Sequence, residues 1–116
     1  MATTPVELAG LIERGLASGE MSESRNFFLT PRGGDVWLAD ALGFAIVAKF
    51  GDPAVAYERL QRAIDDSAHA ADAIGAIASV LDAPIELVRA IDLDHGNGTT
   101  ARRIAQKLRT WEPAAR

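Results

Sequence analysis

The segment from Val36 to Phe50 constrains the fold of this chain more than any other part of the sequence. Its large apolar side chains point in every direction around a helix instead of lining one face. Asp35 precedes the segment as a candidate N-cap, and Gly51 follows it as a candidate stop. Because a helix that is apolar all round must be surrounded by other elements, we expect 36–50 to form the central helix.

Further helices are expected around this segment. Thr4, Pro5 and Glu7 form a capping box with proline at the first helical position, so the first helix begins there and ends near Gly19. Four other segments show apolar residues at helical spacing. They run from Pro53 to Asp65, from a cap at Ser67 to Leu81, from Asp82–Pro84 to Asp92, and from a cap at Thr99 or Thr100 to Pro113. Residues 93–98 have the composition of a turn-rich loop.

One stretch, residues 20–34, carries no helical pattern. Asn26–Thr30 is typical of a short extended segment, and Pro31–Gly34 is typical of a turn. Phe27 and Phe28 fit either a hydrophobic plug over the core, which we favour, or an exposed binding patch.

These elements predict an all-α fold, a compact bundle of five to six helices around the buried helix 36–50 with one short extended segment near 26–30. A chain of 116 residues, 48% of them apolar, can bury a core of its own, so we expect a single domain over 1–116. The absence of cysteine excludes disulfides, zinc–thiolate sites and thiol catalysis. No apolar stretch is long enough to span a bilayer and Met1–Pro5 shows no secretory signal, so we predict a cytoplasmic protein without a membrane partner.

Charge is unevenly distributed along the chain. Residues 1–98 carry 7 basic and 15 acidic side chains, whereas residues 99–116 carry 5 basic and 1 acidic. The last predicted helix places cations on both sides of an apolar stripe of Ile104, Leu108 and Trp111. Such a helix is either a solvated face packed against the acidic body or a contact surface for an acidic partner or a nucleic-acid backbone. The residues of that contact surface would be Arg102, Arg103, Lys107, Arg109, Asp94 and Asn97.

Ligand-binding motifs in this sequence do not meet their full requirements. Gly96-x-Gly98-x-x-Ala101 matches the dinucleotide fingerprint, but that fingerprint needs a strand after the helix, and only 15 residues follow Ala101. The same loop lacks the ligands and the central glycine of a calcium site. His69 lies near Asp65, Asp66 and Asp72, which a solvated helix face explains better than a metal site does. We expect no metal, no cofactor and no enzymatic activity.

The most specific pattern is a helix-turn-helix over residues 74–92. Ala78 and Val88 occupy positions where that motif needs a small residue and a packed aliphatic residue. Asp82 stands where the turn favours glycine, and the second helix offers nucleic acid only Arg89 as a cation. A core hairpin therefore explains the pattern better than a DNA-reading unit does. A DNA-binding surface would use Arg89, Arg102 and Arg103.

Three short words of the sequence are shared with a loosely defined group of proteins. They are Leu11-Ile12-x-x-Gly15, Ala41-Leu42-Gly43, and the stretch from Ile91 through Thr99 to Ile104-Ala105-x-x-Leu108. Through them the chain resembles small uncharacterised helical proteins of phages, prophages and bacteria. Ala39-Asp40 precedes the second word where that group often has a cysteine, and Asp94–Asn97 replaces its Asn-Asp pair. The resemblance implies a helical fold and an origin in a mobile element.

The leading functional hypothesis is a non-enzymatic protein–protein interaction module, in its most specific form a phage-type accessory or anti-defence (inhibitor) factor. The alternative is a DNA-binding helix-turn-helix regulator that uses residues 74–92 and the basic last helix. Trp111 and Phe27–Phe28 fit a homodimer interface as well as a core position.

Overall fold

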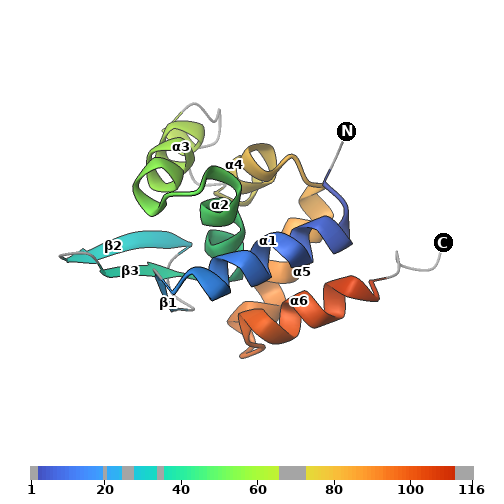
Figure 1. Ribbon diagram of the computed structural model, residues 1–116. Helices are drawn as coiled ribbons and strands as arrows, with labels where there is room; N and C mark the ends of the chain where they lie inside the picture. The colour runs from blue at the N-terminus through green and yellow to red at the C-terminus, as the bar shows by residue number, and fades with distance from the viewer. Residues whose placement is uncertain (1–2, 20, 25–27, 34–35, 66–72, 112–116) are drawn as a thin grey trace.

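A computed structural model of the chain describes residues 3–19, 21–24, 28–33, 36–65 and 73–111. This part is mainly helical, with six helices and a small three-stranded sheet at one end (Figure 1). The elements are α1 (Pro5–Ser18), β1 (Met21–Glu23), β2 (Leu29–Gly33), β3 (Val36–Ala39), α2 (Ala41–Phe50), α3 (Pro53–Asp65), α4 (Ala73–Leu81), α5 (Ile85–Gly96) and α6 (Ala101–Arg109).

Helix α2 is the centre of the fold, as its composition predicts. All residues from Ala41 to Val47 are buried, because α1, α3, α4 and α5 pack around it. Helix α1 crosses it closely at Gly15, where an added Cβ would lie 2.3 Å from the carbonyl oxygen of Phe44. Figure 1 shows α2 enclosed between the other helices and the sheet.

The predicted start of the central helix at residue 36 is wrong. Val36–Ala39 forms strand β3, and the helix begins only after Asp40, whose side chain accepts a hydrogen bond from the backbone N–H of Gly43 at 2.8 Å. Asp40 is therefore the N-cap that the sequence prediction assigned to Asp35. The four residues of β3 are apolar enough to belong to a helix. Asp40, which follows them, has the extended backbone geometry of an N-cap, so the helix does not continue back through it.

The sheet corrects the prediction of an all-α fold. Its strand order is β1-β3-β2, with β1 parallel and β2 antiparallel to the central strand β3. Strand β2 begins within the predicted extended segment and continues through Pro31–Gly33, where a turn was predicted and where the register shifts. Phe28 packs, partly buried, against the core, as the plug interpretation expects. Asn26 and Phe27 lie outside the described residues.

Besides the start of the central helix, the predicted end of the fifth helix differs from the structure, whereas both ends of the first helix agree. Thr4 and Glu7 form the capping box of α1, and Gly19 ends that helix with a φ of 71°. Helix α5 continues to Gly96, so the predicted loop over 93–98 is in fact largely its last turn. The predicted cap at Ser67 and stop at Pro113 fall outside the described residues. No helix in the described ranges is long and apolar enough to cross a membrane.

Candidate functional site

Helix α6 separates its buried and exposed residues sharply. Ala101, Ile104, Ala105 and Leu108 are buried, and the helix lies along α1 with its N-terminal end against α5 (Figure 1). Because these four residues form one stripe, every other side chain of the helix faces water. The exposed side chains are Arg102, Arg103, Gln106, Lys107 and Arg109, which we call the basic face. Trp111, predicted to extend the apolar stripe, is 37% exposed beyond the end of the helix.

Two cations of the basic face are neutralised by the chain itself. The Lys107 ammonium lies 2.7 Å from a carboxylate oxygen of Asp94 at the end of α5. Arg109 forms an ion pair with Glu13 on α1, and this hydrogen-bonded guanidinium lowers the pKa of Glu13. These two ion pairs are contacts of the kind that the other interpretation of this helix expects, in which its cations lie against acidic residues of the body.

The other two cations, Arg102 and Arg103, are exposed and form no ion pair within the part of the chain that the structure describes. They lie in the first turn of α6, which follows along the chain after the predicted partner residues Asp94 and Asn97 at the end of α5. Leu93, which the sequence analysis did not single out, is 64% exposed beside Asp94. The end of α5 and the first turn of α6 thus carry an exposed leucine and two exposed cations that form no ion pair with any other described residue.

Residues 74–92 form two helices joined by a short turn, an arrangement that both a helix-turn-helix and a core hairpin would have. A three-residue turn from Asp82 to Pro84 joins α4 to α5, and Asp82 has a φ of 54°, the left-handed conformation for which glycine is favoured. Ala78 and Val88 are buried at the crossing of the two helices. The exposed face of α5 carries Glu86, Arg89 and Leu93, so Arg89 stands alone there as a cation. It lies on a different helix from Arg102 and Arg103.

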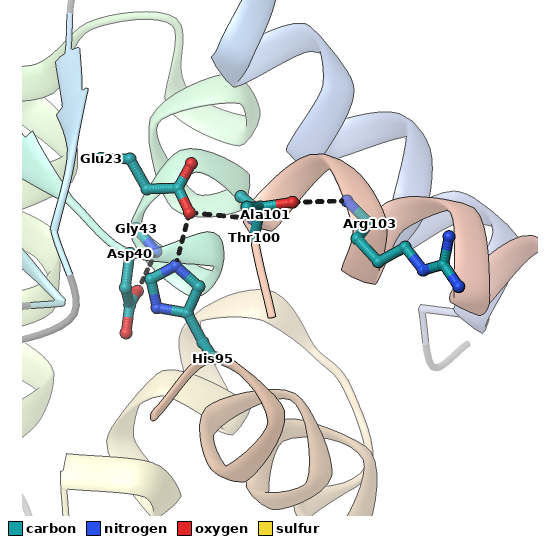
Figure 2. A network of polar contacts seen from close by, with 7 residues as sticks. All are labelled: Glu23, Asp40, Gly43, His95, Thr100, Ala101 and Arg103. Carbon is teal, nitrogen blue, oxygen red and sulfur yellow. Dashed lines mark hydrogen bonds and ion pairs between the residues drawn. The ribbon is translucent and has the colours of Figure 1, made fainter. Parts of the chain in front are cut away.

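A partly buried polar cluster fastens the α5–α6 corner to the sheet, and the sequence analysis missed it. His95 is 2% exposed, and its Nε2 lies 2.8 Å from Oε2 of Glu23 on β1. The same carboxylate oxygen accepts a hydrogen bond from the backbone N–H of Ala101 at 2.9 Å. Figure 2 shows the Glu23 carboxylate between the imidazole and the first residue of α6. His95 and Glu23 are 72 residues apart, so no local pattern links them.

Asp40 is the second buried polar residue beside this corner. Its side chain is the N-cap of α2, and the residue is only 4% exposed. Burial raises the pKa of Asp40 to about 8, and the nearby Asp92 carboxylate adds to that shift, against the lowering effect of the Gly43 hydrogen bond. The carboxyl group is therefore mostly protonated at neutral pH, when it is neutral and cheaper to bury.

The described residues contain no group of three or more His, Cys, Asp or Glu side chains arranged to hold a metal ion. His69, Asp66 and Asp72, considered above as a metal cluster, lie outside the described residues. The Glu23–His95 pair has a carboxylate and an imidazole in contact, but the bond is internal, and Oε2 is already shared with the backbone of Ala101. The arrangement is thus built to hold chain segments together.

Comparison with known proteins returns no match for this chain. No family model matches it, and neither a curated protein nor a solved structure shows significant similarity. The corner between α5 and α6, with its exposed cations and its contact between Glu23 and the buried His95, is therefore interpreted from its own geometry alone.

Proposed function

We propose that the chain is a non-enzymatic protein–protein interaction module that binds an acidic protein surface through the α5–α6 corner. The observation that carries the proposal is the pair Arg102 and Arg103, exposed without ion pairs among the described residues on a chain whose net charge is −4. On a protein of net negative charge, a cationic patch attracts an acidic partner to that patch, while the rest of the protein surface repels the partner.

The geometry around these two arginines supports protein binding over a purely solvated role. Leu93, on the neighbouring helix α5, supplies an exposed apolar side chain, and an apolar anchor with a charged rim is the usual composition of a protein interface. The stripe that packs α6 against α1 keeps the cations on a rigid helix. Lys107 and Arg109 are bound to Asp94 and Glu13, so they contribute less than the sequence analysis predicts.

Reversing the charges of Arg102 and Arg103 tests the proposal. The double variant Arg102→Glu, Arg103→Glu is compared as bait in a nuclease-treated host lysate with Arg14→Glu, Arg59→Glu, which makes the same charge change on α1 and α3. We expect one host protein to co-purify in near-stoichiometric amount with the wild-type bait and with the control bait. Its recovery should fall at least about tenfold with the α6 variant, because like charges then face each other across the interface. Equal recovery with all three baits would contradict the proposal.

A DNA-binding regulator remains the second candidate, favoured by the left-handed Asp82 in the turn and by the buried crossing of α4 and α5. This candidate requires an affinity for duplex DNA that falls roughly 10³-fold or more between about 50 and 200 mM salt, if six or more phosphates are contacted. Arg89→Ala and Arg103→Ala should each flatten that dependence. Fluorescence anisotropy of a labelled duplex measures it. If no binding to the duplex is detected at the lower salt concentration, this candidate is excluded, because electrostatic binding is strongest there. The exposed face of α5 itself offers DNA one cation and also carries one carboxylate.

The biological setting stays a prediction. A phage-type accessory or anti-defence role rests on the resemblance of three short words in the sequence, and a partner identified in the pull-down would test it directly. A defence or regulatory protein of the host with an acidic surface is the outcome that this role requires.

A further inference from the structure

The turn that matches a nucleotide-binding fingerprint already holds an anion, and the chain supplies it. Gly96–Ala101 leads into the N-terminus of α6, where unpaired backbone N–H groups and the helix dipole favour a negative charge. Oε2 of Glu23 occupies that position, 2.9 Å from the Ala101 nitrogen and 2.8 Å from Nε2 of His95. Both donors converge on one oxygen atom, as Figure 2 shows.

We propose that His95 and the first turn of α6 form a receptor for the internal carboxylate of Glu23, and that Glu23 is thereby the positioning residue of the basic face. The receptor joins three segments that are distant in sequence, namely β1, the end of α5 and the start of α6. That Glu23 positions a binding surface rests on the proposed function; that it holds α6 in place does not.

The donors at this helix end are divided between two acceptors. The Thr100 hydroxyl accepts from the backbone N–H of Arg103, and Glu23 accepts from that of Ala101. The φ of Gly98, 106°, lets the chain turn back between the two helices, a conformation that side chains other than glycine rarely adopt. The glycine motif of residues 96–101 is therefore explained by the backbone geometry of the turn and by the hydrogen bond from the Ala101 N–H to the Glu23 carboxylate.

The carboxylate also fixes the hydrogen positions of His95. An ionised carboxylate only accepts hydrogen bonds, so Nε2 of His95 carries the hydrogen that points at Glu23. Since His95 is buried, removal of Glu23 leaves this N–H and that of Ala101 without an acceptor inside the protein. The Glu23 side chain itself is 34% exposed, so a small carboxylate from solution can reach the vacated position.

Chemical rescue tests the receptor. In Glu23→Ala, the Ala101 amide should exchange with solvent about 10- to 100-fold faster than in wild type, as expected for a lost hydrogen bond to a charged group. Sodium formate should restore part of the protection and raise the melting temperature, whereas sodium chloride at equal ionic strength should not. Glu58→Ala, which removes an exposed carboxylate paired with Arg62, is the matched control and should not respond to formate.

A second variant covers the case in which Glu23→Ala does not fold. Glu23→Gln keeps an oxygen that can accept both hydrogen bonds but removes the charge, so we expect Ala101 exchange between that of wild type and that of Glu23→Ala. Nitrogen-15 NMR of wild type should show His95 with its hydrogen on Nε2 whenever the ring is neutral. Wild-type exchange at Ala101 in the folded Glu23 variants, or a response to formate no greater than to chloride, overturns the receptor.

The same variants separate this inference from the proposed function. If formate rescues Glu23→Ala but Arg102→Glu, Arg103→Glu still recovers the partner, the receptor stands and the basic face is not the binding surface. If reversal of the two arginines abolishes recovery but formate has no effect on Glu23→Ala, the binding surface stands and Glu23 does not position it.

Discussion

Substitution of Gly43 by alanine is expected to destabilise the protein by about 3 kcal/mol or more, the upper range for forcing atoms into a packed core. A Cβ at residue 43 would lie 1.8 Å from the carbonyl oxygen of Phe28 and 2.9 Å from the Cβ of Ala39. The first contact is with backbone that also accepts a hydrogen bond from the Asp40 N–H, so it cannot move away without breaking the junction of sheet and helix. Urea unfolding followed by circular dichroism measures the loss.

Gly10→Ala is the matched control for this prediction. Gly10 lies inside α1 with open space around the position of an added Cβ, so alanine there should stabilise the protein by about 0.5–1 kcal/mol through its higher helix propensity. The two glycine-to-alanine changes therefore act in opposite directions. An unfolding midpoint for Gly43→Ala equal to that of wild type would mean that α2 is not seated against the chain at Phe28.

Local chemistry explains what the sequence predicts correctly. The capping box of Thr4 and Glu7 and the cap of α6 at Thr100 depend on residues only three positions apart; the first is found where predicted, and the second is one of the two residues predicted, Thr99 or Thr100. The central position of α2 follows from its composition, because Ala41–Val47 offers no polar face to water. Such features need no knowledge of the distant parts of the chain.

Strand β3 could not be predicted in the same way. A run of four apolar residues next to a helix fits either a helical turn or a buried strand. What makes Val36–Ala39 a strand is its pairing with Met21–Glu23 on one side and Leu29–Gly33 on the other. The pairing is non-local, so it leaves no periodicity in the sequence.

The candidate site shows the same division. The amphipathic pattern placed the cations of α6 together on one exposed face, but it could not show that Glu13, 96 residues from Arg109, neutralises one of them. Nor could it show that His95 faces Glu23. Each of these pairs forms only once α1 and β1 pack beside α5 and α6.

Protein stability should fall as the pH rises from about 4 to about 8 because of Asp40, and Asp40→Asn should remove this contribution. The pKa of Asp40 is raised from 3.8 to about 8 in the folded protein, chiefly by burial. Between these pH values the folded state holds a proton that the unfolded state has released, so the free energy of unfolding decreases by up to about 1.4 kcal/mol for each pH unit. Above the folded pKa both states are ionised and the contribution is fully lost.

The difference between wild type and Asp40→Asn isolates this effect from other titrating groups. Asparagine stays neutral, and its side-chain oxygen can still accept the hydrogen bond from Gly43, so the cap of α2 is kept. The variant and wild type should have similar free energies of unfolding near pH 4, and the variant should be more stable by several kcal/mol near pH 9. Asp52→Asn, which alters an exposed carboxylate that accepts from the Ala54 N–H, is the control and should follow wild type. If wild type and Asp40→Asn run parallel across this range, the Asp40 carboxyl group is ionised in the folded protein, and the end of α2 is open to water.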